Sequence, residues 1–171
     1  MFALRCTRKL LDRIKVSPDS EPVPPDTVLG DWYANLVRAG RTQVVLAVSE
    51  RTLLPVVVPA REGRTVARRV AEAIEPLLLS IGVPAEAANA ERDAMQDAVI
   101  AKTASRRVLG SLNDLAFQLQ VGLHHFPDRT LLAQSLWLAQ TPLKLIEYGS
   151  PDRATLAAFA AAEALHRAAC R

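Results

Sequence analysis

Three apolar segments that follow one another between residues 31 and 58 place the strongest constraint on what this chain can fold into. Residues 42–48 are rich in β-branched side chains, which suit the pleated surface of a sheet. Short polar breaks at 39–41 and 49–52 separate this segment from its neighbours, and strands joined by such short turns pair antiparallel. We therefore predict an antiparallel meander. Pro55 in the third segment cannot donate a ladder hydrogen bond, which indicates an edge strand or a bulge.

The rest of the chain is predicted to be mostly helical, with two further strands near residues 1–7 and 98–104. Residues 17–28 contain four prolines among small and acidic residues, which predicts a surface loop. Pro76 is expected to kink or split the helix in which it lies. Apolar residues at three- to four-residue spacing predict helices over residues 9–16, 65–81, 85–93, 106–121, 131–139 and 151–169.

The order of these elements indicates an α+β fold rather than alternating β-α-β units. A chain of 171 residues is long enough to bury one core but too short for two. We predict one domain over residues 1–171. Its small antiparallel or mixed sheet combines the meander with the two outlying strands and packs against the helices.

Composition excludes several classes of protein. Half of the residues are hydrophobic and 23% are charged, which is the balance of a globular chain. No apolar run approaches the roughly 18 residues of a membrane span, and the start lacks the apolar core of a secretory signal. We therefore expect a cytoplasmic protein with no membrane partner. Without an export signal we expect a reducing cytosol and therefore free thiols. Cys6 and Cys170 lack metal-ligand spacing, so we expect no metal. No glycine-rich phosphate loop is present, and we expect no cofactor.

The polar pattern around Lys102 is the most informative in the chain. A strand passes there through a short turn into a helix, whose first free N–H groups favour an anion. Lys102, Arg106 and Arg107 add positive charge at the same point. Further along, Ser111 and Asp114 share a helix face with Arg107 by their spacing. Two interpretations stay open, namely a ligand site and a structural network of paired side chains.

A second basic cluster lies at the start of the helix that follows the meander. Arg61, Arg64, Arg68 and Arg69 are close together in the sequence, and Arg64 and Arg68 are four residues apart on one face. Such a stripe would track a nucleic-acid backbone. The alternative is a solvated helix face, since no aromatic residues are interleaved to stack on bases.

Several motifs occur in an order that resembles a family of small bacterial proteins of unknown function. They are LRCT at residues 4–7, GDWYANL at 30–36, AKT at 101–103 and RVLGSLNDLAF at 107–117. The resemblance spans nearly the whole chain. It implies a bacterial cytosolic single domain, and it implies no activity.

The polar residues of these motifs form the candidate site that the resemblance implies. Charged and amide side chains are costly to bury unless they are paired, so motifs made of them are unusual for a core. They converge if the first strand, the first strand of the meander and the strand near 98–104 lie side by side. The candidate ligand-binding residues are Arg5, Trp32, Asn35, Lys102, Thr103, Arg106, Arg107, Ser111, Asn113 and Asp114.

The leading functional hypothesis is a non-catalytic binding module for an anionic partner, namely nucleic acid, a nucleotide or another phosphate-bearing ligand. In this hypothesis Lys102, Arg106 and Arg107 supply the charge, while Asn113 and Trp32 orient or stack on the ligand. The charge must be local, because the net charge of the whole chain is only +3.

Two alternatives remain from the sequence. An interaction protein, such as one half of a pair encoded by a small operon or mobile element, would dock a partner or a second copy on the alanine-rich last helix. A small enzyme would use Asp114 or Asp31 as a base. Nothing in the residue spacing demands an enzyme, so the sequence favours a protein without catalytic activity.

Overall fold

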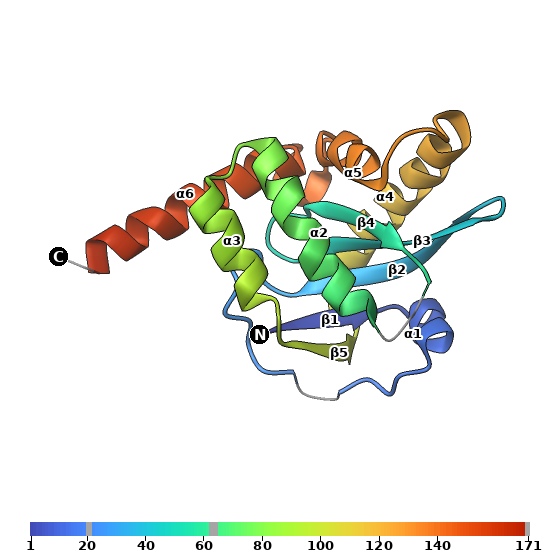
Figure 1. The fold of residues 1–171 in the computed structure, drawn as a ribbon, viewed down its shortest axis with the longest axis horizontal. Helices are drawn as coiled ribbons and strands as arrows, with labels where there is room; N and C mark the ends of the chain where they lie inside the picture. The colour runs from blue at the N-terminus through green and yellow to red at the C-terminus, as the bar shows by residue number, and fades with distance from the viewer. Residues whose placement is uncertain (20–21, 62–64, 170–171) are drawn as a thin grey trace.

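The predicted meander forms the larger part of one mixed sheet in the computed structural model, which describes residues 1–19, 22–61 and 65–169. The strands are β1 (Phe2–Cys6), β2 (Trp32–Ala39), β3 (Thr42–Ser49), β4 (Pro55–Pro59) and β5 (Ala98–Lys102). They lie in the order β4-β3-β2-β1-β5 (Figure 1). β2, β3 and β4 pair antiparallel as predicted, whereas β1 is parallel to both β2 and β5.

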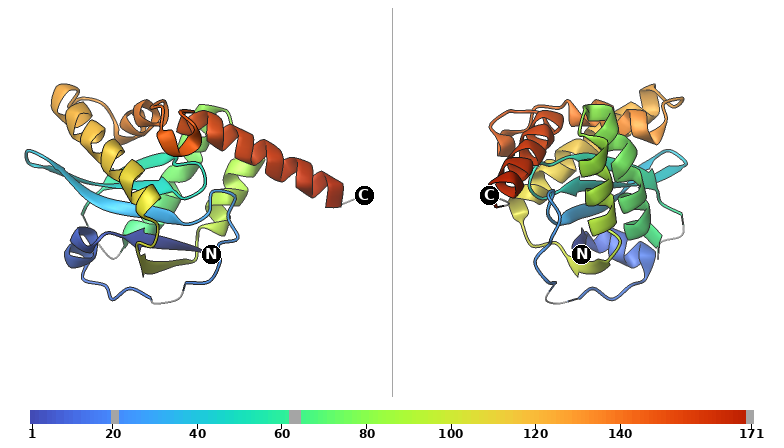
Figure 2. Two further views of the ribbon diagram at one scale, coloured as in Figure 1. Left: turned by 180° about the vertical axis from the view of Figure 1, so that it is seen from behind. Right: turned by 60° about the vertical axis from the view of Figure 1, so that its left-hand side comes forward.

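Helices cover both faces of this sheet (Figures 1 and 2). They are α1 (Arg8–Ile14), α2 (Val66–Ile81), α3 (Ala85–Ala94), α4 (Arg106–His125), α5 (Leu131–Ala139), the short 3-10 turn η2 (Lys144–Ile146) and α6 (Pro151–Ala169). The α+β class predicted from the sequence is confirmed. Within the described ranges, no helix is both long enough and apolar enough to cross a membrane.

Two hydrophobic cores lie on opposite faces of the sheet. Successive residues of a strand point to opposite faces, so β2 contributes to both cores. Trp32 and Leu36 pack in the first core, which α1, α2 and α3 cover. Tyr33 and Val37 pack in the second core, which α4 and α5 cover. β2 is therefore apolar on both sides, as expected for a strand enclosed between two helical layers.

The outer edge of β4 is closed to further strands. The Val57 N–H points away from β3 and donates to the Ser135 Oγ of α5 at 2.9 Å. Pro55 and Pro59 lie two residues to either side of Val57, so their backbone nitrogens face the same way, and proline has no N–H. An edge strand without free donors cannot pair with another chain. The edge position predicted from Pro55 is confirmed.

The proline-rich loop protects the other edge of the sheet, at β5. The Asp19 N–H donates to the Ile100 carbonyl at 2.7 Å, and Asp19 forms an isolated parallel bridge with Ala101. The loop passes along the outside of β5 before the chain enters β2 (Figure 1). The segment predicted as a surface loop therefore also shields the edge strand.

Two helix predictions need correction. We expected Pro76 either to kink or to split its helix, and the split is absent because α2 runs without a break through Pro76. Pro76 is exposed, whereas Leu77 and Leu78 are fully buried in the first core, and this packing holds the helix together. α4 continues to His125 rather than ending near residue 121.

The two glycines inside α4 give a test of how closely α4 and α5 pack. A Cβ atom at Gly122 would lie 2.7 Å from the Gln134 Oε1 and 2.8 Å from the Trp137 ring, whereas a Cβ at Gly110 would meet nothing within 4 Å. We expect Gly122→Ala to lower the free energy of unfolding by about 1–3 kcal/mol through overpacking. Gly110→Ala should raise it by about 0.5–1 kcal/mol, since alanine is the better helix former.

Urea unfolding of the two variants and the wild type measures both effects. Because both substitutions are Gly→Ala in the same helix, intrinsic helix propensity cancels between them. Equal stabilisation by both variants would contradict the close approach of α4 and α5 at Gly122.

Candidate functional site

The neighbouring parallel strands β1 and β5 end at the same edge of the sheet, and the helices that follow them leave toward opposite faces. Leu10 and Ile14 of α1 pack in the first core, whereas Val108 and Leu112 of α4 pack in the second. In open sheets, ligands bind in the crevice outside the carboxyl ends of strands where the connections diverge in this way. We call this region, with the first turns of α1 and α4, the carboxyl edge.

A pocket of about 360 Å³ opens beside the carboxyl edge. Strand register places Arg5 and Ala101 side by side on the α4-facing side of the sheet. Lys102 has the opposite orientation, because it is in register with the buried Cys6. The proline-rich loop supplies the outer wall. The lining residues are Arg5, Pro18, Asp19, Pro22, Ala101, Lys102, Thr103 and Ala104.

Arg5, which lines the pocket, forms an ion pair with Asp31, the residue just before β2. The Arg5 Nε and Nη2 atoms each lie 2.8 Å from the Asp31 Oδ2. The other Asp31 oxygen accepts from the Ala3 N–H at 2.9 Å, and the Arg5 Nη1 donates to the Lys102 carbonyl at 3.4 Å. The Asp31 side chain is 3% exposed and that of Arg5 is 18% exposed. This pair therefore connects β1, β2 and β5 through the side chains of two residues.

Two polar contacts fix the helices that begin at the carboxyl edge. The Tyr33 hydroxyl accepts from the N–H of Ser105, the N-cap of α4, at 3.1 Å. Burial raises the pKa of Tyr33, so the hydroxyl is protonated at neutral pH. The Thr7 hydroxyl donates to the Asn35 Oδ1 at 2.8 Å and caps the first turn of α1. Tyr33, Asn35 and Thr7 thus position the helix starts.

Exposed cations surround these fixed groups. Lys102 is the last residue of β5, Arg106 and Arg107 follow that strand, and Arg8 and Lys9 follow β1. All five are exposed, and among the described residues none of them forms an ion pair with a carboxylate. Arg5, by contrast, is committed to Asp31.

The structure brings together part of the candidate set predicted from the sequence. β2, β1 and β5 lie side by side, which confirms the hypothesis on which the set depended. Arg5, Lys102 and Thr103 line the pocket. Arg106 and Arg107 begin α4 next to it, and Asn35 is tied to the same edge through Thr7.

Four other candidate residues lie outside both the pocket wall and the first turn of α4. Trp32 has no exposed surface and faces the first core, so it is unavailable for stacking on a ligand; its Nε1 has no hydrogen-bond partner among the described residues. Ser111 is buried between α4 and the sheet. Asn113 and Asp114 are exposed further along α4. For the three residues of α4, the sequence pattern did not indicate how far they lie from the strand ends.

The arginine cluster at the start of α2 is partly engaged in local contacts. Arg69 donates to the Pro59 carbonyl at 2.7 Å and to the Thr65 hydroxyl at 2.8 Å. Arg68 lies 3.6 Å from the Glu72 carboxylate. Arg61 is exposed, and Arg64 lies outside the described residues. Arg69 thus joins the end of β4 to α2.

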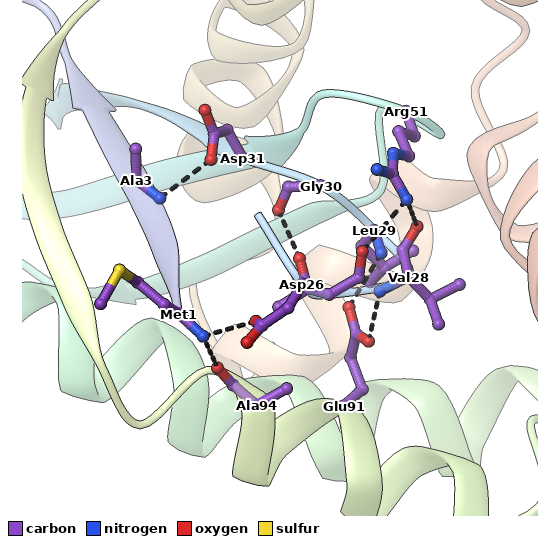
Figure 3. Close-up of polar contacts among 11 residues, drawn as sticks. Met1, Ala3, Asp26, Val28, Leu29, Gly30, Asp31, Arg51, Glu91 and Ala94 are labelled. Carbon is purple, nitrogen blue, oxygen red and sulfur yellow. Dashed lines mark hydrogen bonds and ion pairs between the residues drawn. The ribbon is translucent and has the colours of Figure 1, made fainter. Parts of the chain in front are cut away.

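Sequence reasoning missed a second polar cluster, which anchors the segment before β2 (Figure 3). The buried Glu91 of α3 accepts from the N–H groups of Val28 and Leu29 at 2.8 and 2.9 Å. Arg51 donates to the carbonyls of Thr27 and Val28, both at 3.1 Å. A glutamate beside other charged residues in an alanine-rich helix ordinarily indicates a solvated position, so the local sequence showed no sign of this role.

The same close-up shows the beginning of β1 held from two sides. The amino group of Met1 contacts the Asp26 carboxylate and the Ala94 carbonyl. Gly30 adopts a φ of 77°, a left-handed conformation that favours glycine. A Cβ atom there would also lie 3.1 Å from the Arg51 side chain. The turn into β2 therefore depends on a glycine beside Arg51.

Neither a metal centre nor an activated thiol is apparent in the described ranges. These residues contain no group of three or more His, Cys, Asp or Glu side chains arranged to hold a metal ion. Burial raises the pKa of the Cys6 thiol to about 12. Cys6 is therefore protonated at neutral pH and packs as a small apolar side chain, in agreement with the free thiol expected from the sequence.

Removal of Arg5 tests the structural role of the ion pair. Arg5→Ala leaves the buried Asp31 carboxylate without its partner, and we expect the free energy of unfolding to fall by about 3 kcal/mol. Lys102→Ala removes a nearby exposed cation that has no ion pair and should change it by less than about 0.5 kcal/mol. Urea unfolding measures both. Similar small effects from the two variants would contradict the fastening role of Arg5.

The pH dependence of stability tests the buried Glu91. Burial raises its pKa in the folded protein, against the lowering by the two backbone N–H donors and Arg51. The native state then holds a proton that the unfolded chain releases at lower pH, so stability from this group falls as pH rises above about 4.3. Relative to Glu91→Gln, the wild type should lose stability from this pH up to the raised pKa.

Unfolding of both proteins at a series of pH values measures this difference. Glu86→Gln on the exposed side of α3 controls for the amide substitution itself. A wild type that gains stability over Glu91→Gln as pH rises would show that the N–H donors and Arg51 outweigh burial.

Comparison with known proteins places the chain in a family. No curated protein and no solved structure matches it. A family model described as Domain of unknown function (DUF6933) matches residues 3–154, from the second residue of β1 to the start of α6, and this range includes the carboxyl edge. The match covers most of the chain and agrees with the resemblance noted in its motifs. The chain therefore belongs to the DUF6933 family of domains of unknown function.

Proposed function

We propose that this protein is a cytoplasmic, non-catalytic binding module whose partner carries phosphate groups, and that the carboxyl edge is the binding surface. The observation that carries the proposal is the group of cations without ion pairs at this edge. They lie at or just after the ends of two neighbouring parallel strands, and within the described chain none has an ion pair: Lys102, Arg106, Arg107, Arg8 and Lys9.

Local backbone charge favours an anion at the same place. The N-terminus of α4 carries partial positive charge from its first N–H groups. One of these, on Val108, is already bonded to the Ser105 side chain. In the proposal, the remaining groups and the side chains of Arg106 and Arg107 attract the ligand from the start of α4. Because the cations are exposed, their attraction weakens as salt rises.

Arg5 and Asp19 limit where the ligand sits. Arg5 uses its donors on Asp31 and on the Lys102 carbonyl, so it shapes the pocket wall more than it binds. Asp19 places a carboxylate in the outer wall, which repels an anion from the pocket floor. The proposal therefore puts the phosphate at the rim, between the starts of α1 and α4.

The proposed surface would bind the phosphate groups of a nucleic acid rather than its bases. No aromatic side chain lines the pocket in the described chain, and both Trp32 and Tyr33 are fully buried. Stacking, which holds bases in many single-strand binding proteins, is thus unsupported at this edge. If the partner is a nucleic acid, binding is expected to depend little on base sequence.

Binding is favoured over catalysis by the state of the two candidate bases. The Asp31 carboxylate accepts hydrogen bonds from Ala3 and Arg5 and is 3% exposed. Asp114 lies on α4 away from the pocket wall. Neither carboxylate faces the pocket beside an orienting partner, an arrangement that general base catalysis needs.

Binding of a labelled oligonucleotide tests the proposal. The double variant Arg106→Ala/Arg107→Ala should weaken binding about tenfold and reduce the salt slope by about 1.5, the loss of two phosphate contacts. Arg38→Ala/Arg41→Ala, at the exposed turn between β2 and β3, removes the same charge and should leave binding nearly unchanged. Fluorescence anisotropy between about 50 and 200 mM salt measures both.

Parallel titrations with a nucleoside triphosphate and with inorganic phosphate distinguish the kinds of phosphate ligand. Binding of either one that weakens in the Arg106/Arg107 variant supports the proposal with a small ligand. If none of the three probes binds at low salt, or if both double variants weaken binding equally, the carboxyl edge is not the binding surface.

A further inference from the structure

The second half of α6 extends away from the rest of the molecule (Figures 1 and 2). From Ala160 to Ala169 every residue is exposed except the half-buried Ala162, and Leu165 is 73% exposed. A helical segment of this length is marginal in water without packing. Besides Glu163, His166 and Arg167 it contains only alanine and Leu165, and small side chains allow close contact with another helix. Most side chains of the projecting half of α6 are therefore exposed in the described chain.

A groove runs between α3 and α6, with a volume of about 720 Å³. Its α3 wall combines the small side chains of Ala87, Ala90 and Ala94 with the glutamates Glu86 and Glu91. Its α6 wall contains Leu156 and Phe159 near the base, where α6 is still packed on the body of the protein. The groove is lined by both apolar and charged side chains, and the two helices diverge outward (Figure 1).

We propose that the groove receives α6 of a second copy of this chain, which makes the protein a two-fold symmetric dimer. In this arrangement the two α6 helices lie side by side, each also packed against α3 of the other copy. Leu165 then packs on the alanines of the partner copy's α3. Because α6 is both a wall of one groove and the occupant of the other, the surface is self-complementary, as a two-fold interface requires.

Charge on the two walls supports a second copy as the occupant. Asp26 and Glu86 lie on the loop and α3 side of the groove, whereas His166 and Arg167 lie near the tip of α6. A second α6 brings its basic tip toward the acidic side. Arg167 pairs with Glu163 on its own helix, but an exposed pair of this kind contributes little and can be exchanged for contacts across the interface.

The chain exposes more surface than is expected for a folded monomer of its mass. It amounts to 9428 Å², whereas a folded monomer of this mass is expected to expose about 8,200 Å². The excess, on the order of 1,200 Å² by this scaling, exceeds the roughly 800 Å² that each partner buries in a standard interface. The projecting helix contributes to that excess.

The dimer is independent of the proposed anion site. The carboxyl edge lies at the ends of β1 and β5, and none of its cations lines the α3–α6 groove. The family model ends at residue 154, at the start of α6. The projecting half of α6 therefore lies beyond the matched region, and dimerisation is proposed for this chain rather than for the whole family.

Sedimentation velocity over a range from micromolar to several hundred micromolar protein tests the proposal. The wild type should sediment as a dimer of 18.6 kDa chains at the higher concentrations. Leu165→Glu and Ala90→Arg should each weaken the association at least tenfold, because they place a charge on the two surfaces that meet. Leu132→Glu, an exposed leucine on α5, is the matched control and should leave the dimer intact.

Circular dichroism and urea unfolding check that the variants fold. Leu165 is mostly exposed in the single chain, so its substitution should leave the monomer folded. A wild type that stays monomeric over the whole concentration range overturns the proposal, whether or not another protein occupies the groove. A dimer that resists both Leu165→Glu and Ala90→Arg also overturns it.

Discussion

The Asp31 carboxylate holds together the three strands around which the rest of the fold is arranged. One of its oxygens accepts from the backbone of β1, and the other pairs with Arg5, which also reaches the backbone of β5. Removing two charges from water costs more than their attraction returns in many buried pairs. This pair therefore fixes how β2, β1 and β5 align, because any other alignment would leave Asp31 buried without its hydrogen-bond donors.

The parallel arrangement of β1, β2 and β5 determines where the helices lie. Parallel neighbouring strands need long crossover connections. The connection from β1 to β2 contains α1 and the proline-rich loop, and α2 and α3 precede β5. α1 and α4 then leave the carboxyl edge toward opposite faces of the sheet. The cations that begin these helices meet at this edge because the strands before them are fastened together. The proposed binding surface is thus a consequence of the sheet topology.

Much of the fold was predictable because local sequence signals agree with it. The β-branched run in β3 and the short turns beside it define the meander, and Pro55 indicates its edge. The position of Trp32 was not predictable from alternation, since helices cover both faces of the sheet and both Trp32 and Tyr33 are buried. The role of Glu91 was not predictable from the sequence, because its hydrogen-bond donors, the N–H groups of Val28 and Leu29, are more than sixty residues away.

The central claim is that Arg5 and Asp31 fasten the sheet while the cations beyond them remain available to a phosphate-bearing partner. Titration of the isotope-labelled protein with a short oligonucleotide, followed by NMR chemical shifts, tests this most directly. The account predicts that the amide signals of residues 7–9 and 103–107 shift together, while the Arg5 Nε signal stays in place. Shifts confined to the start of α2, or displacement of the Arg5 Nε signal from its position beside Asp31, would contradict it.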